Sequence, residues 1–351
     1  MATVLHLCCC ILLLCAGAKA AAVPAVYVLG DSLADVGNND YLALSILKAN
    51  YPHNGVDYPG GKATGRFNNG KNSADFIAEM LGVPSPPPYL SIRHNNNKLQ
   101  TFLQGVNFAS GGAGVLDTTN SGQCLTFSKQ VEFFSRVCTD LVQQLGSDQA
   151  NNHMAKSIFA LVIGSNDIFS YNKSPKNTPP QEFVNSMITN LGEHLKTLYS
   201  LGARKFAFVG TGPVGCCPSR RDKRTGSCDA KANTMSLMFN AGAAPLLQQM
   251  KSEHGDMHYS FFNSSSALSA ILQNPATYGF TEVKDACCGL GSLIPKVGCL
   301  PISSLCTNRS SHVFWDFVHP SQRTAELLTT TFFHGSSPYV YPVNVKALTS
   351  L

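Results

Sequence analysis

Four groups of residues in the sequence carry side chains or backbone groups suited to acyl-transfer chemistry. They are Gly-Asp-Ser-Leu at 30–33, Ser-Gly-Gly-Ala-Gly at 110–114, Gly-Ser-Asn-Asp at 164–167 and Asp-Phe-Val-His at 316–319. Together they offer a hydroxyl, backbone N–H groups, an amide, a carboxylate and an imidazole. Serine-based acyl transfer needs this combination, because a base takes the hydroxyl proton, an acid orients the base, and hydrogen-bond donors stabilise the anionic intermediate.

Ser32, Asp316 and His319 have the residue types of a catalytic triad. A spacing of three residues lets Asp316 and His319 lie on the same side of one tight turn. The carboxylate can then bond Nδ1 of the imidazole, while Nε2 points toward the serine hydroxyl. The sequence therefore predicts Ser32 as nucleophile, His319 as general base and Asp316 as the residue that orients the imidazole.

Donors for the negatively charged oxygen are expected from the same groups of residues. The candidates are the backbone N–H of Ser32, the backbone N–H of either Gly111 or Gly112, and the side-chain amide of Asn166. Preorganised donors of this kind each lower the barrier by roughly 2.7–4 kcal/mol in well-studied enzymes. Asn166 is therefore expected to matter nearly as much for the rate as the triad.

Each motif has a plainer structural interpretation when it is taken alone. Residues 30–32 can be a turn that begins a helix, 111–114 a tight connection, 164–167 an Asx turn, and Asp316 with His319 an ordinary surface pair. Three of the motifs, however, follow apolar runs that have the character of strands. The catalytic interpretation is favoured because ligands of open parallel sheets bind beyond the carboxyl ends of the strands.

Short apolar runs alternate along the chain with segments of helical periodicity, which predicts a parallel sheet covered by helices on both faces. The expected strands are 25–29, 106–109, 158–163, 206–209 and 259–262, and the expected helices are 73–81, 128–145, 183–201, 232–254 and 321–333. The predicted fold class is α/β, with three α/β/α layers around a central, mostly parallel five-stranded sheet. The long connections 50–72, 82–98 and 210–229 are expected to shape the approach of the substrate.

Composition and the N-terminal segment indicate a globular, exported protein. The 351-residue chain is 44% hydrophobic and 13% charged, which excludes disorder caused by high charge and low hydropathy. Its net charge of +5 comes without basic runs, so no nucleic-acid partner is expected. An apolar run from Leu5 to Cys15, followed by Ala-Lys-Ala at 18–20, predicts that residues 1–20 are a signal peptide rather than a membrane anchor. Residues 21–351 are then expected to form a single domain without a transmembrane segment.

Nine of the 13 cysteines remain once residues 1–20 are removed, and a secreted chain oxidises such thiols. The expected disulfides link the 216/217 pair to Cys228 and the 287/288 pair to Cys299 and Cys306, with the individual pairing left open. Because nine is odd, at least one thiol is expected to be unpaired. N-x-Ser sequons, which are typical of glycosylated secreted proteins, lie at Asn172, Asn263 and Asn308.

Metal and nucleotide sites find little support in the sequence. Neither C-x-x-C nor H-E-x-x-H occurs. Residues 65–72 approach a phosphate-binding loop, but Asn72 replaces the Ser or Thr that would hold magnesium. Residues 210–215 imitate a dinucleotide fingerprint, but Pro213 and the paired cysteines replace the helix that would bind the pyrophosphate. We expect no metal and no organic cofactor. The absence of G-x-S-x-G also disfavours the α/β-hydrolase fold.

Six longer sequence blocks contain the reactive motifs. They are VLGDSLADVGNN at 28–39, TGRFNNGK at 64–71, GVNFASGG at 105–112, GSND at 164–167, GPVGC at 212–216 and VFWDFVHP at 313–320. Together these blocks resemble the plant GDSL-type esterase/lipases of the SGNH hydrolase superfamily. The resemblance spans nearly all of the chain after the signal peptide.

This resemblance implies a flavodoxin-like SGNH hydrolase fold and a role for each matched residue. The implied catalytic residues are Ser32, Asp316 and His319. The implied oxyanion hole consists of Ser32, Gly112 and Asn166. Gly112 is preferred over Gly111 as the glycine of that set. Because the family usually has one cysteine in the 212–216 block, Cys217 is an additional residue here and the expected unpaired thiol.

The expected function is a secreted serine esterase or lipase that hydrolyses carboxylic esters through an acyl-enzyme intermediate. Its partner would be a small-molecule ester, either a lipid or an acetylated carbohydrate, and its location extracellular, in the apoplast or cell wall. One alternative is an acyltransferase that passes the acyl group to an alcohol. Another is a catalytically silent binding protein, which the complete set of reactive residues disfavours. The identity of the ester and the oligomeric state stay open.

Overall fold

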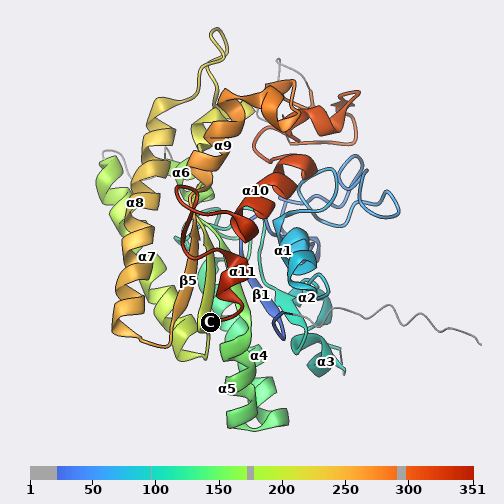
Figure 1. Cartoon of the computed structure of the whole chain (residues 1–351). Coiled ribbons are helices and arrows are strands. Elements are labelled where there is room, and N and C mark those ends of the chain that lie inside the picture. The colour runs from blue at the N-terminus through green and yellow to red at the C-terminus, as the bar shows by residue number, and fades with distance from the viewer. Residues whose placement is uncertain (1–21, 96, 172–177, 291–297) are drawn as a thin grey trace, which may run out of the picture.

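A computed structural model describes residues 22–95, 97–171, 178–290 and 298–351 of the chain. The predicted signal peptide at 1–20 and the sequon at Asn172 lie outside these residues. The described residues are built around a six-stranded sheet with the strand order β10-β5-β4-β3-β1-β2 (Figure 1). The α/β class and the mostly parallel central sheet predicted from the sequence are confirmed.

Five strands of this sheet are parallel and correspond to the five predicted strands. They are β1 (Val26–Gly30), β2 (Gly105–Asn107), β3 (Ile158–Val162), β4 (Lys205–Val209) and β5 (His258–Phe262). The sixth strand, β10 (Val340–Pro342), pairs antiparallel with β5 and was not predicted. Its three residues include Pro342, which has no N–H to donate and is therefore tolerated only at a sheet edge.

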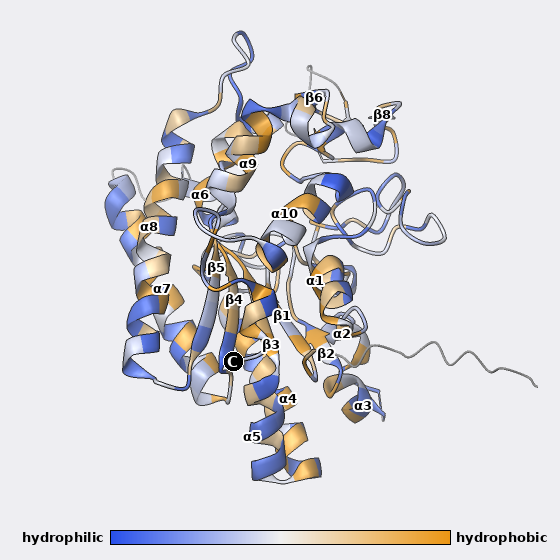
Figure 2. Ribbon diagram, in the orientation of Figure 1, coloured by the Kyte–Doolittle hydropathy of each residue, from blue (hydrophilic) through white to orange (hydrophobic). Residues whose placement is uncertain are grey.

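Helices cover both faces of the sheet, and the five predicted helices are all present within three residues at each end. On one face lie α4 (Phe127–Leu145), α5 (Ser147–Lys156), α7 (Pro180–Ser200) and α8 (Ala230–Glu253), and on the other lie α1 (Ser73–Leu81), α10 (Gln322–His334) and α11 (Val345–Leu348) (Figure 1). In Figure 2 the turns of α7 and α8 alternate between hydrophilic and hydrophobic residues, as expected of helices with one face against a sheet.

The two faces of the sheet carry side chains of different size. On β1, Tyr27 and Leu29 pack into the core on the α4 side, whereas Val26 and Val28 pack into the core on the α1 side. The first core is rich in phenylalanine. On the second face β3 contributes the smaller Ala160. Alternation along each strand thus leaves more room between the sheet and the helices α1 and α10.

The chain after β5 forms α9 (Ser264–Gln273) and then two small sheets. In one of them β6 (Glu282–Ala286) pairs with β9 (His312–Phe314), and in the other β7 (Cys288–Gly289) pairs with β8 (Ser304–Leu305). Among the described residues, no helix combines the length and the apolar character needed to cross a bilayer.

Disulfides connect the cysteine pairs that the sequence grouped together. The bonds are Cys216–Cys228, Cys287–Cys306 and Cys288–Cys299, and among the described residues the unpaired thiols are Cys124, Cys138 and Cys217. The predicted grouping is confirmed, and the structure resolves the pairing that the sequence left open.

Candidate active site

Ser32 lies just beyond the carboxyl end of β1, where the chain turns away from the sheet. Gly30 has a φ of 153°, and a Cβ at this position would collide with the carbonyl oxygen of Val162 on β3. The amide of Gln130, on α4, bonds both backbone groups of Gly30 at 2.8 Å. The N–H of Asp31 donates to the Val162 carbonyl at 2.9 Å. These bonds fix the start of the turn that presents the Ser32 hydroxyl.

The three residues predicted to form a triad lie within hydrogen-bond distance of one another. Oγ of Ser32 is 2.8 Å from Nε2 of His319, and Nδ1 of His319 is 2.8 and 2.9 Å from the two carboxylate oxygens of Asp316. Because a carboxylate only accepts, Nδ1 carries the ring proton and Nε2 is free to accept from the serine. Asp316 and His319 are only 3% and 7% exposed. This is the arrangement that general-base activation of a serine requires.

A turn after β9 holds Asp316 and His319 together. One oxygen of Asp316 accepts the backbone N–H of Val318 at 3.0 Å and that of His319 at 2.8 Å. The N–H of Trp315 donates to the carbonyl of His319 at 2.8 Å. Ser321 then caps α10 at its N-terminus. The spacing of three residues thus produces the tight turn that the sequence predicts.

The N–H groups of Gly111 and Gly112 differ in their surroundings. The N–H of Gly111 donates to Oδ2 of Asp35 at 2.9 Å. Across the described residues, by contrast, the N–H groups of Gly112 and Ser32 have no hydrogen-bond partner. Gly112 and Ser32 also line the same cavity, of about 670 Å³. The geometry therefore favours Gly112 over Gly111 as a donor to a bound oxygen.

Asn166 lies on the first turn of α6 (Ser165–Ser170), shortly after β3, and lines the same cavity as Ser32. Its amide nitrogen donates to the carbonyl of Ala113 at 3.0 Å, which leaves a second amide hydrogen available. The neighbouring Asp167 accepts two backbone N–H groups and one hydroxyl from residues 115–119. Asp167 therefore anchors the loop after β2.

Three polar residues after the nucleophile hold the loops that follow β1 and β2. Asp35 accepts the N–H of Asn38 at 2.8 Å, and the amide nitrogen of Asn38 donates to two carbonyls of residues 107–109, each at 2.8 Å. The amide nitrogen of Asn39 donates to the Gly111 carbonyl at 2.8 Å. Through these contacts Asp35, Asn38 and Asn39 support the loops beside the nucleophile.

Within the segment 65–72, Asn72 has a structural role as the residue that caps α1. The side chain of Asn72 accepts the N–H groups of Ala74 at 3.1 Å and Asp75 at 3.4 Å and so caps α1. Asp75 in turn accepts the N–H of Asn72 at 2.9 Å. This capping box accounts for the position that would carry a magnesium ligand in a phosphate-binding loop.

Two residues of this segment were not singled out from the sequence. The ring of Phe67 lies 5.2 Å from the imidazole of His319, centroid to centroid, and lines the 670 Å³ cavity. The guanidinium of Arg66 forms two hydrogen bonds of 2.7 Å with the carboxylate of Asp75, and both side chains are buried. The sequence feature that could have pointed to both residues is the block at 64–71, in which an arginine and a phenylalanine stand between small polar residues.

Two of the three long connections that were expected to shape the approach of the substrate line the 670 Å³ cavity. Tyr51 belongs to the connection 50–72, and Arg220 belongs to the connection 210–229. The described residues of 82–98 do not line it. They instead support the loop after β1, because the N–H of Leu90 donates to the side chain of Asn38.

The disulfide-linked segment supports the strand that leads to the histidine. Trp315 is fully buried, and its indole N–H donates to the side chain of Asn54 at 3.0 Å. The N–H of Cys288 donates to the carbonyl of Trp315 at 2.7 Å, and the N–H of Cys287 donates to that of Phe314 at 3.0 Å. The two disulfides at 287 and 288 therefore fix the residues immediately before Asp316.

Asp31, beside the nucleophile, is a buried carboxyl group without a cationic hydrogen-bond partner in the described part of the chain. Its side chain accepts the N–H of Leu33 at 3.0 Å and is 1% exposed. Burial raises the pKa of Asp31 to about 7. Burial also raises the pKa of Asp167 to about 6. Both groups are therefore protonated more easily than an exposed aspartic acid.

The described residues contain one cluster with metal-ligand side chains, formed by Cys287, Cys306 and His312. The two sulfur atoms are joined in a disulfide, so neither is a thiolate that could bind an ion. We therefore assign no metal to this cluster.

Comparison with known proteins places these observations in a family. The sequence model of the GDSL-like lipase/acylhydrolase family matches residues 26–330. GDSL esterase/lipase At5g55050 of Arabidopsis thaliana is 42% identical over 344 residues, which cover 95% of this chain and 91% of that protein. GDSL esterase/lipase At5g37690 of the same plant is 38% identical over 328 residues, which cover 90% of this chain and 91% of that protein.

Among solved structures, a catalytic mutant of Axe2, an acetylxylan esterase from Geobacillus stearothermophilus, is similar with a TM-score of 0.40 and 12% identity. The match covers 88% of this chain and 92% of that chain, and a likeness of this degree carries no information about the substrate. The family match over residues 26–330 and the two plant relatives decide the assignment: the chain belongs to the GDSL-like lipase/acylhydrolase family.

Proposed function

We propose that the protein is a secreted serine esterase that hydrolyses carboxylic esters through an acyl-enzyme intermediate on Ser32. As a member of the GDSL-like lipase/acylhydrolase family with curated esterase/lipase relatives, the chain is a carboxylic ester hydrolase. The observation that carries the serine mechanism is the 2.8 Å contact between Oγ of Ser32 and Nε2 of His319, which is oriented by Asp316.

The reaction proceeds in two steps. In the first, His319 takes the hydroxyl proton while Oγ of Ser32 attacks the acyl carbon, and it then returns this proton to the departing alcohol. In the second, a water molecule gives its proton to His319 and attacks the acyl carbon, so that the acid leaves and Ser32 regains its hydrogen. Asp316 stabilises the imidazolium that forms in each step.

The negative charge of the tetrahedral intermediates falls on the former carbonyl oxygen. We assign its stabilisation to the N–H groups of Ser32 and Gly112 and to the amide of Asn166. The support for this assignment is that the two backbone groups have no partner among the described residues and that all three residues line one cavity. Donors fixed in advance stabilise the intermediate without reorganisation at the moment of reaction.

The proposed location is extracellular, with residues 1–20 removed as a signal peptide and residues 21–351 forming one catalytic domain. The three disulfides support this location, because they persist in oxidising compartments. Asn308, in a sequon, is exposed and accessible to glycosylation, and Asn263 is partly buried as the cap of α9.

Steady-state kinetics on purified, secreted protein with p-nitrophenyl esters test the proposal. Ser32→Ala should lower kcat/KM by at least about 10⁴-fold, and Asn166→Ala should lower kcat by about 10²–10³-fold. Ser135→Ala is the matched control, because Ser135 is a partly buried serine on α4 and should leave the rate unchanged. Equal activity of Ser32→Ala and wild type would refute the assignment of the nucleophile. Transfer of the acyl group to added methanol in preference to water would favour the acyltransferase alternative.

A further inference from the structure

Two cavities meet at the proposed nucleophile. One is the 670 Å³ cavity described above, and the other has a volume of about 140 Å³. Both are lined by Ser32, Asn166 and His319. An ester has two parts, an acyl group that stays on the serine and an alcohol that leaves. Two cavities that share the nucleophile in their linings offer separate places for these parts.

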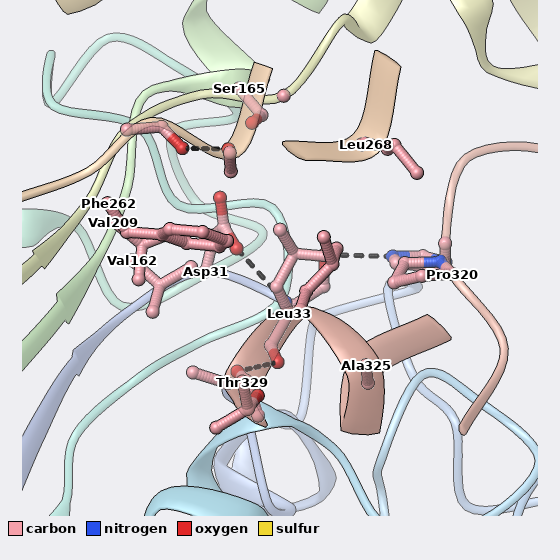
Figure 3. A pocket seen from close by; sticks show the side chains of 18 of the residues that line it. Asp31, Leu33, Val162, Ser165, Val209, Phe262, Leu268, Pro320, Ala325 and Thr329 are labelled. Carbon is pink, nitrogen blue, oxygen red and sulfur yellow. Dashed lines mark hydrogen bonds between the residues drawn. The ribbon is translucent and has the colours of Figure 1, made fainter. Parts of the chain in front are cut away.

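The smaller cavity lies between the sheet and the helices α1, α9 and α10 (Figure 3). Val28 and Ala160 form part of its floor on β1 and β3, Ile77 contributes from α1, Leu268 from α9 and Leu328 from α10. The cavity exists because this face of the sheet carries Val and Ala where the opposite face carries large aromatic side chains. Its lining is therefore mainly aliphatic.

Two hydroxyl groups in this lining, those of Ser73 and Ser264, are occupied by hydrogen bonds to the backbone, whereas those of Ser165 and Thr329 have no partner among the described residues. The hydroxyl of Ser73 donates to the carbonyl of Leu33 at 2.7 Å, and the hydroxyl of Ser264 donates to the carbonyl of Gly210. Burial raises the pKa of Asp31, the only acidic side chain that the described residues contribute to this lining, and so favours its uncharged form. A sugar has several hydroxyl groups, more than Ser165 and Thr329 can satisfy, whereas a hydrocarbon chain needs no hydrogen-bond partner.

The larger cavity has a different lining. It includes the side chains of Lys48, Tyr51 and Arg220 together with apolar residues. These groups can hydrogen-bond a polar alcohol or headgroup, which an aliphatic lining cannot. The contrast assigns the acyl part of the ester to the smaller cavity and the alcohol part to the larger one.

We propose that the 140 Å³ cavity binds the acyl chain of the substrate and limits it to about six carbon atoms, so that the preferred substrates are medium-chain esters rather than acetyl or long-chain esters. This inference rests on the proposed acyl-enzyme mechanism at Ser32. The limit follows from volume, because an apolar protein cavity of about 150 Å³ holds one benzene molecule, which has six carbon atoms. Longer chains must leave part of their length outside.

The rate should follow chain length in a characteristic way. Each methylene group that enters the cavity should raise kcat/KM about fourfold, so that hexanoyl esters react about 10²-fold faster than acetyl esters of the same alcohol. The gain should end near this length, because further methylene groups find no room. Esters of p-nitrophenol with acyl chains from acetyl to palmitoyl measure this dependence directly.

Two adjacent threonines on α10 provide a matched pair of variants. Thr329 is buried and lines the cavity (Figure 3), whereas Thr330 is exposed. Thr329→Leu fills part of the cavity and should lower the ratio of hexanoyl to acetyl activity at least 10-fold. Thr330→Leu makes the same chemical change outside the cavity and should keep the wild-type ratio. Measured as a ratio, the effect is independent of the amount of folded enzyme.

A second pair tests the opposite change and covers the case in which Thr329→Leu does not fold. Leu268→Ala enlarges the cavity and should move the optimum to longer chains, toward octanoyl and decanoyl esters. Leu272→Ala, on the same helix, is the control because Leu272 does not line the cavity. An unchanged optimum in Leu268→Ala and an unchanged ratio in Thr329→Leu would overturn the inference.

The dependence of wild-type activity on acyl chain length, measured together with Ser32→Ala, distinguishes the proposal of the serine mechanism from the proposal of the acyl-chain cavity. If acetyl esters react as fast as hexanoyl esters and Ser32→Ala is inactive, the serine mechanism stands and the acyl-chain cavity is wrong. If Ser32→Ala retains wild-type activity, the mechanism is wrong and the inference falls with it. A hexanoyl optimum that Thr329→Leu abolishes and Thr330→Leu preserves supports both.

Discussion

The backbone N–H of Gly111 donates to Oδ2 of Asp35 at 2.9 Å and thereby ties the loop after β2 to the turn that follows the proposed nucleophile. This bond occupies the N–H of Gly111, while the next N–H in the chain, that of Gly112, has no partner among the described residues. Asp35 therefore occupies the N–H of Gly111 and leaves the N–H of Gly112 available to a bound oxygen. It also fixes the distance between two of the proposed oxyanion donors, Ser32 and Gly112.

Replacement of Asp35 should disturb this arrangement without touching the triad. In Asp35→Asn one carboxylate oxygen becomes an NH₂ group, so at least one of the three backbone N–H groups that Asp35 accepts loses its partner. An unsatisfied buried donor costs about 1–3 kcal/mol. We expect that loss of unfolding free energy and a decrease in kcat of about 10-fold, with a smaller change in KM. Denaturant titration and kinetics measure both effects. Asp148→Asn, at an exposed position on α5, is the control, and equal values in both variants would contradict the positioning role.

The buried ion pair between Arg66 and Asp75 should contribute to stability far more than an exposed pair nearby. Arg66→Met leaves the Asp75 carboxylate buried without its cation and should cost about 3–5 kcal/mol of unfolding free energy. Lys71→Met removes the exposed pair with Glu79 and should cost less than about 1 kcal/mol. Urea unfolding of the two variants compares them. Similar losses in both would mean that the buried pair has no special role.

Asp31 gives the stability a distinct pH dependence. Its folded-state pKa of about 7 lies above the ordinary value of 3.8, so between these limits the folded state binds more protons than the unfolded state. Its contribution to the unfolding free energy is therefore present at pH 4 and is lost as the pH rises to 7, by up to about 1.4 kcal/mol per pH unit. Asp31→Asn does not titrate and should make this slope shallower. Thermal unfolding from pH 4 to 8 provides the measurement, and parallel curves for wild type and variant would be inconsistent with the burial of this charge.

The disulfides at 287 and 288 should support activity as well as stability. The bond Cys287–Cys306 closes a loop of 19 residues beside the strand that leads to Asp316, and its removal should cost about 3 kcal/mol. We expect Cys287→Ser with Cys306→Ser to lower both Tm and kcat, because the turn that holds the imidazole loses support. Cys124→Ser, which alters an unpaired thiol, should change neither. A lowered Tm with unchanged kcat would restrict the disulfide to a purely structural role.

The sequence predicts the five parallel strands because each is a short run of mainly apolar residues, and it predicts the long helices because each has one apolar face. It does not predict β10, whose three residues include Pro342 and depend on pairing with β5. It also does not predict α5, in which only Ala150 and Met154 are buried. Both elements owe their structure to neighbours rather than to a local pattern.

The reactive residues were predictable because their chemistry restricts the choice. The contacts that other side chains make with these residues were harder to predict. Phe67 lies against the imidazole of His319, and Gln130 bonds Gly30, but neither residue stands near its partner in the sequence. The 140 Å³ cavity was likewise not predictable, since it depends on small side chains on β1 and β3 facing α10 across the core. Such features arise only when distant segments pack together.

The most direct test of the account is to identify the residue that becomes acylated. The wild-type protein is treated with a fluorophosphonate, which traps an activated serine, and the modified peptide is mapped by mass spectrometry. The account predicts one adduct, on Ser32, with modification about 10⁴-fold slower in Asp316→Asn and none in Ser32→Ala. An adduct on another residue, or equal modification of wild type and Ser32→Ala, would contradict it.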